Sequence, residues 1–149
     1  MNLEHYDYFT NSAFKDYEFF SEGPKGKIKK SIHYTKLDDA DIPIHNLAFG
    51  DQNTATNSID DLIVSNNKDK DLVLATVAHT IDQFCSHHLD QYVFAAGSTP
   101  ARTRLYQMGI SRLWDQISVD FDLLGLKNHK WLPFKYGINY DAFMVKKKK

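Results

Sequence analysis

Apolar and polar residues alternate along the chain with two different periods, and the two periods predict different elements. Residues 17–35 alternate with period two on either side of a Gly-Pro-Lys-Gly turn at 23–26, which is typical of half-buried strands. In residues 68–88 the apolar positions recur every three or four residues, which predicts an amphipathic helix. A second helix begins at Pro100, behind a hydroxyl N-cap, and fades near Ile117.

Short apolar runs bounded by turn-forming residues supply the other strands. They cover residues 42–49, 59–64, 91–96, 119–124, 131–134 and 138–145. Residues 127–130 form a hairpin turn, because Asn128 tolerates a positive φ, and Pro133 places its own strand at 131–134 at an edge of the sheet. The predicted order is β-β-β-α-β-α-β-β-β, an α+β domain in which two helices pack on a largely antiparallel sheet.

The composition favours a single domain over residues 1–149 and excludes several classes of protein. An aromatic share of 13% and a balance of 18 basic against 19 acidic side chains exclude wholesale disorder and a uniformly basic nucleic-acid coat. No apolar stretch is long enough to span a membrane, and the first residues lack the pattern of a signal peptide. The single cysteine, Cys85, fits a reducing compartment, so we expect a cytoplasmic protein. The basic tail at 146–149 is expected to be disordered.

The turn between the strand at 91–96 and the second helix is the main candidate site. Glycine lets a ligand approach the backbone closely, and the N–H groups at the start of a helix attract anions. All three arginines of the chain lie in this helix, whereas every other basic residue is a lysine. The predicted anion-binding residues are Gly97, Ser98, Thr99, Arg102, Arg104 and Tyr106. A purely structural role remains open, because any strand-to-helix turn favours an N-cap followed by proline.

Asp120 and Asp122 form a second candidate site. Two residues apart on a strand, their carboxylates would project to the same face and could hold Mg²⁺ over a triphosphate. With Gly97 and Ser98 they resemble the nucleotidyltransferase pattern, in which a Gly-Ser turn follows a strand and a D-x-D strand comes soon after. The chain departs from that family in its longer gap between Gly97 and Asp120 and in its N-terminal strands. A strand whose acidic side chains simply face solvent would show the same pattern, so a structural explanation is also open.

The remaining polar groups have simpler structural explanations. Cys85 and His88 share a helix face near His79 and Asp82, but zinc requires a second pair of ligands, and Cys85 is typical of a small buried hydrophobe. No histidine stands out as a general base, which leaves catalysis open. The basic strand face and the basic tail suit either a nucleic-acid backbone or solvent. These lysines are Lys25, Lys27, Lys29 and Lys146 to Lys149.

Several runs of residues indicate a relationship that covers the whole chain. They are residues 46–51, 74–77, 97–106, 133–134 and 139–143, and the run that begins at Gly97 and reads GSTPARTRLY is the most specific. With these runs the chain resembles a bacterial family of similar length, found mainly in Bacteroidota, which carries only the designation of a domain of unknown function. That resemblance implies no activity, and the family's signature does not include Asp120 or Asp122.

Three hypotheses follow. The first is a binding protein for a phosphate-bearing ligand, either a nucleotide or a nucleic acid, at the turn from Gly97 to Arg104, with no cofactor. The second is a protein–protein interaction module, such as a toxin–antitoxin or defence partner, anchored by arginine and by aromatic residues such as Tyr106 and Trp131. The third is a nucleotidyltransferase-like enzyme that uses Mg²⁺ at Asp120 and Asp122.

Overall fold

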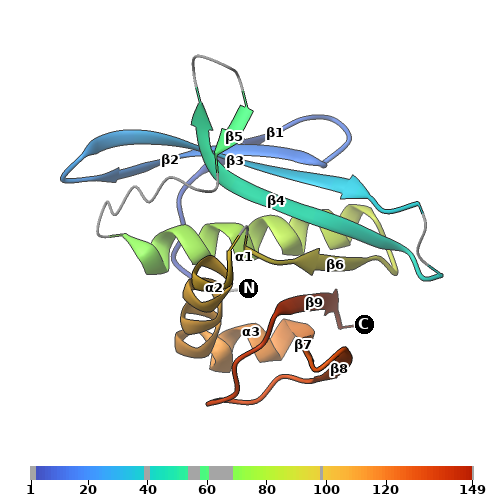
Figure 1. Ribbon diagram of the computed structural model, residues 1–149. Helices are drawn as coiled ribbons and strands as arrows, with labels where there is room; N and C mark the ends of the chain where they lie inside the picture. The colour runs from blue at the N-terminus through green and yellow to red at the C-terminus, as the bar shows by residue number, and fades with distance from the viewer. Residues whose placement is uncertain (1–2, 39–40, 54–57, 61–68, 98, 149) are drawn as a thin grey trace.

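The computed structural model describes residues 3–38, 41–53, 58–60, 69–97 and 99–148, and these residues form an α+β domain. One sheet contains all nine strands of the described residues, and α1 lies between the two ends of this curved sheet (Figure 1). The expected fold class, with its largely antiparallel sheet, is therefore confirmed. Within the described ranges, no helix is both long enough and apolar enough to cross a bilayer.

The helices and strands follow one another in an order close to the predicted one. The strands are β1 (Tyr8–Thr10), β2 (Asp16–Gly23), β3 (Gly26–Lys36), β4 (Ile44–Asn53), β5 (Ser58–Asp60), β6 (Tyr92–Ala95), β7 (Phe121–Lys127), β8 (Lys130–Pro133) and β9 (Ala142–Lys147). The helices are α1 (Lys70–His87), α2 (Pro100–Arg112) and α3 (Trp114–Asp120). The short strand β1 was not predicted, and residues 61–64 of one predicted strand lie outside the described residues.

The strands are arranged in the order β1-β2-β3-β4-β6-β9-β7-β8, and β5 pairs with β4. Every pairing is antiparallel except that of β4 with β6, in which His45 lies opposite Val93. Parallel neighbours require a long crossover connection, and α1 lies in the connection between these two strands. The edge position predicted for the strand that contains Pro133 is confirmed, because β8 ends the sheet.

The prediction of two helices was wrong, because α3 lies between α2 and β7. The α2 helix ends at its C-cap Leu113, and a separate short helix continues to Asp120, where a strand from residue 119 was expected. Ile117 is buried while Val119 is 70% exposed. The four-residue spacing of Leu113 and Ile117 places both on one side of a helical turn that faces the core, and the extended backbone begins only at Phe121.

The expectation of a disordered basic tail at 146–149 differs from the structure. Lys146 and Lys147 complete β9, and the ammonium Nζ of Lys147 lies 2.7 Å from Asp82 Oδ1 on α1. The backbone N–H of Lys148 donates to the carbonyl of Asp120 at 2.8 Å. Strand pairing and these contacts fix the backbone up to residue 148, and Lys149 lies outside the described residues.

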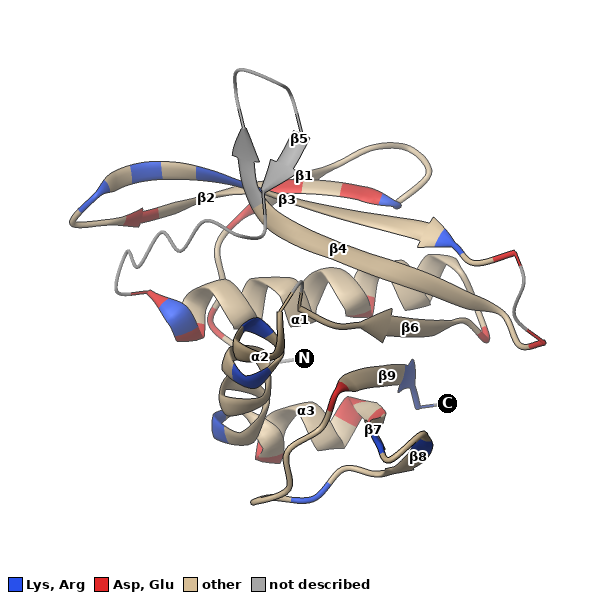
Figure 2. Ribbon diagram, in the orientation of Figure 1, with Lys and Arg blue, Asp and Glu red and all other residues tan. Residues whose placement is uncertain are grey.

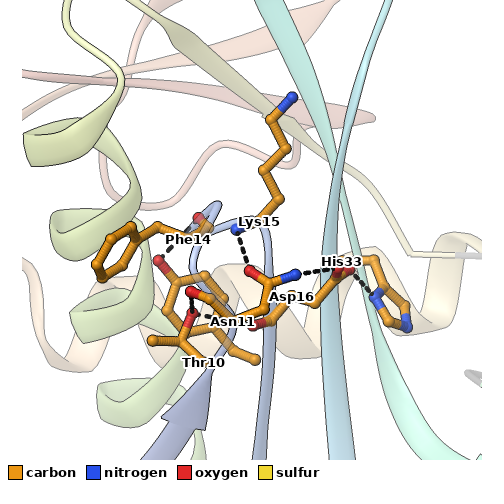
Figure 3. Close-up of polar contacts among 7 residues, drawn as sticks. Thr10, Asn11, Phe14, Lys15, Asp16 and His33 are labelled. Atoms are coloured by element: carbon orange, nitrogen blue, oxygen red, sulfur yellow. Dashed lines mark hydrogen bonds and ion pairs between the residues drawn. The ribbon is translucent and has the colours of Figure 1, made fainter.

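Side chains and backbone together close the connection between β1 and β2 (Figure 3). The Asn11 amide Nδ2 donates to Asp16 Oδ2 at 2.7 Å, and the Thr10 hydroxyl donates to the Asp16 carbonyl at 3.0 Å. The second carboxylate oxygen of Asp16 contacts His33 Nδ1 on β3. Phe14 adopts a positive φ of 56° within this connection. These contacts hold the edge strand β1 in register with β2.

The core lies between α1 and the face of the sheet that α1 covers. Phe19 on β2, Phe84 on α1 and Phe143 on β9 are fully or almost fully buried. The Phe84 ring stacks on Tyr34 of β3 with 4.3 Å between ring centroids. Burial of one such side chain stabilises a fold by about 1.5–3 kcal/mol. The helix therefore joins strands from both halves of the sheet.

His45 on β4 is a buried histidine in its neutral form. It is 4% exposed, and its ring Nδ1–H donates to Gln91 Oε1 at 3.1 Å. Phe84 packs edge-on against the ring at 4.8 Å between centroids, and within the described part of the chain Nε2 has no hydrogen-bond partner. Burial, aided by the positive charge of Lys15, lowers the pKa of His45 below its ordinary value.

We expect the free energy of unfolding to decrease as the pH falls below about 6.5. The unfolded chain then binds a proton at His45 that the folded protein excludes, so protonation favours unfolding. Burial also lowers the pKa of His79, which acts in the same direction. Urea denaturation between about pH 5 and pH 8 should show a smaller dependence on pH in His45→Phe than in the wild type. Identical pH dependence in the two proteins would contradict the assignment to His45.

Candidate ligand-binding cavity

An apolar cavity of about 360 Å³ lies between the helices and the sheet face that they cover. Four walls are formed by α1, α2, β4 and the end of β6, and residues of α3, β7 and β9 close the rest. The central lining residues are Leu47, Phe49, Leu74, Ala78, Tyr106, Gly109 and Ile110. A volume of this size is within the range of pockets that hold small molecules. This cavity was not predicted from the sequence.

The helices α1 and α2 approach each other closely beside the cavity. A Cβ atom at Gly109 on α2 would lie 1.8 Å from Leu74 Cδ1 on α1. Only glycine therefore allows the two backbones this separation without a shift of Leu74. One turn further along α2, Arg112 Nε donates to Asp71 Oδ1 at 2.8 Å and holds the helices at this separation. A glycine inside an otherwise helical sequence was the signal that could have indicated this contact.

The predicted Gly97 turn lies at one end of the cavity, and Gly97 itself lines the wall. Its N–H donates to Thr103 Oγ1 at 2.9 Å, and a Cβ atom at this position would lie 2.4 Å from the Cβ of Arg102. Thr99 caps α2 as expected, because its hydroxyl oxygen accepts the backbone N–H of Arg102 at 3.2 Å. The first turn of α2 thus occupies the space beside Gly97. Ser98 lies outside the described residues.

The three arginines of α2 have different positions (Figure 2). Arg102 and Tyr106 are four residues apart and so lie on one face of α2, and Tyr106 lines the cavity. The Nη2 atom of Arg102 is buried. Arg104 is exposed and lies about 200° around the helix from Arg102. Arg112 pairs with Asp71 of α1. Of the predicted site residues, the structure therefore brings Gly97, Arg102 and Tyr106 together, while Arg104 lies apart from them.

Asp120 and Asp122 do not form the predicted pair of metal ligands. Asp120 is the last residue of α3, whereas Asp122 is exposed on β7 opposite Lys146 of β9. They therefore do not lie two residues apart on one strand, which is the geometry that the transferase hypothesis requires. Within the described ranges, no group of three or more His, Cys, Asp or Glu side chains could hold a metal ion.

The other polar candidates have structural partners. Burial raises the pKa of the Cys85 thiol to about 11, which agrees with its interpretation as a small buried hydrophobe. His79 Nδ1 lies 2.9 Å from the Tyr8 hydroxyl, and His88 Nε2 lies 2.8 Å from the carbonyl of Ala13. The proposed interface anchor Trp131 packs edge-on against Phe94 at 6.1 Å between ring centroids.

Cross-strand ion pairs neutralise part of the basic strand face. Lys29 lies 3.0 Å from Glu18, and Lys27 lies 3.5 Å from Glu22. Figure 2 shows acidic residues on β2 beside the basic residues of β3. A mixed surface of this kind gives little long-range attraction for a phosphate backbone.

Alanine substitutions at Gly97 and Gly109 should differ in their effect on the free energy of unfolding, because one meets rigid backbone and the other meets a flexible side chain. In Gly97→Ala the new methyl group meets the backbone of Arg102 and Thr103, which cannot move without unwinding the first turn of α2. We expect a loss of about 1–3 kcal/mol in unfolding free energy. In Gly109→Ala the methyl group meets the tip of Leu74, which borders the cavity and can turn into it. Urea denaturation should therefore show a smaller loss, and equal losses would contradict this difference.

Comparison with known proteins identifies a family and no activity. No curated protein and no solved structure matches the chain. Residues 2–148 match the description "Family of unknown function (DUF6934)", which covers nearly the whole chain. The protein therefore belongs to the family of unknown function DUF6934.

Proposed function

We propose that the protein binds a small ligand with an apolar body and an anionic end. The body occupies the cavity between α1, α2 and the sheet, and the anionic end lies against the first turn of α2. The cavity of about 360 Å³ with apolar walls is the observation that carries the proposal. A concave apolar pocket of this size is the usual form of a small-molecule binding site.

The position of Arg102 supports the proposal that the ligand has an anionic end. The cavity-facing stripe of α2 contains Tyr106, Gly109 and Ile110, and one turn towards the N-terminus the same face presents Arg102. The positive end of the helix dipole adds to its charge. An anion at this end of the cavity therefore meets a guanidinium group and a helix N-terminus together.

A small ligand fits these observations better than a nucleic acid. The N–H groups of Gly97 and Arg102, expected to hold a phosphate, donate to Thr103 and Thr99 instead. Recognition then depends on the cavity and on the side chain of Arg102, while the mixed charges of β2 and β3 offer no continuous track for a phosphate backbone. A phosphate group remains one form of the anionic end.

A protein-binding module is the second candidate. Leu105 and Met108 on α2 are 38% and 49% exposed, and Arg104 is exposed beside them. Apolar side chains next to an arginine are typical of interface anchors. Binding of this kind uses the side of α2 that faces away from the cavity, and it would not respond to substitutions inside the cavity.

A set of apolar anions of about a dozen non-hydrogen atoms each, including naphthalene sulfonate and octyl sulfate, tests the cavity directly. We expect at least one of them to bind saturably and to raise the melting temperature of the wild type, since a ligand at 100 times its Kd adds about 2.7 kcal/mol of stability. Ala78→Leu narrows the cavity and should strongly weaken both effects. Ala101→Leu, the same change at an exposed position, should leave them unchanged. No saturable binding, or equal binding by both variants, would contradict the proposal.

A further inference from the structure

We infer that the body of the ligand is an unbranched hydrocarbon chain with a single acidic group at its end. This inference rests on the proposed function and narrows it to one class, the medium-chain alkyl acids. Three observations lead to it: the chemistry of the cavity walls, the volume of the cavity, and the position of the single arginine on its helical face.

The walls offer almost no hydrogen bonds to a ligand. Among the described lining residues, only Asn46 and Tyr106 have polar side chains. Strand alternation turns the side chain of Asn46 away from the face that carries His45 and Leu47. A nucleobase or a sugar would leave several donors and acceptors unsatisfied in such a cavity, which costs about 1–3 kcal/mol for each group. The walls therefore select a ligand whose buried part has no polar atoms.

The volume sets the length of the chain. A water molecule occupies about 30 Å³ in the liquid, so a cavity of about 360 Å³ accepts on the order of a dozen heavy atoms. Phe49 and Tyr106 face each other across the wall with ring centroids 6.4 Å apart and a tilt of 58°. These rings leave no gap that a ligand can enter, so the ligand has to bend around them, which favours a flexible chain over a rigid aromatic body.

The charge defines the other end of the ligand. Arg102 is not among the described lining residues, but it lies one turn before Tyr106 on the same face of α2, and its Cβ lies beside Gly97, which forms part of the wall. A ligand with its chain in the cavity then places a terminal carboxylate or phosphate next to the guanidinium. Both groups offer the guanidinium at least two oxygen atoms that accept charge-assisted hydrogen bonds.

Calorimetric titration of the full chain with sodium alkanoates, kept below their micelle concentrations, tests the inference. From hexanoate to dodecanoate we expect the Kd to fall about fourfold for each added methylene, the factor that corresponds to about 0.8 kcal/mol. Hexadecanoate should bind no more tightly than dodecanoate. Dodecyl phosphate, in a parallel titration, identifies which acidic group is preferred.

Paired arginine variants test the acidic end. Arg102→Gln should weaken dodecanoate binding about tenfold and leave dodecanol binding almost unchanged, because only the charged ligand uses the guanidinium. Arg104→Gln, the same change on the opposite side of α2, should affect neither ligand. Melting temperatures of both variants show whether either loss reflects unfolding. Equal weakening of dodecanoate and dodecanol by Arg102→Gln would overturn the role of the acidic end.

The outcomes separate this inference from the proposed function. If naphthalene sulfonate binds and Ala78→Leu weakens its binding, while no alkanoate binds, the cavity is a ligand site and the alkyl-acid inference is wrong. If no probe shows binding that depends on Ala78, both fail. A Kd that does not change with chain length would also overturn the inference, because a chain inside the cavity gains contacts with each methylene.

Discussion

The parallel pairing of β4 with β6 is the constraint on which most of the remaining structure depends. Two parallel neighbours cannot be joined by a tight turn, so the chain must cross one face of the sheet between them, and α1 makes that crossing. Its position determines which face becomes the core. It also places Phe84 against both Tyr34 and His45 and leads the chain through β6 to Gly97, where α2 begins. The cavity lies where these elements meet.

Local patterns in the sequence predicted local structure well. Period-two alternation gave the β2–β3 hairpin, and apolar spacing gave α1 within two residues at its start and one at its end. The turn between β7 and β8 has the positive φ angles expected at Asn128, and Thr99 caps α2. These features depend on contacts between residues close in the sequence, which the residue types alone determine.

Features that depend on distant contacts were not predictable in the same way. The sequence around Ile117 to Leu123 fits both a helical and an alternating pattern, and only the packing of Ile117 in the core decides for α3. Gly97 is also ambiguous, because a close approach by a ligand and a close approach by Arg102 require the same residue. The cavity is harder still to predict, since small residues such as Ala78 and Gly109 form its walls from separate elements.

The position of β9 affects when the cavity can exist during synthesis. Of the described strands β9 comes last along the chain, yet it lies between β6 and β7 and contributes Phe143 and Val145 to the cavity wall. A chain that emerges from the ribosome cannot join the two halves of its sheet until this strand is free. Until then α1 packs against strands on one side only, and the wall of the cavity lacks Phe143 and Val145. A ligand can therefore bind in the cavity only after β9 has been inserted into the sheet.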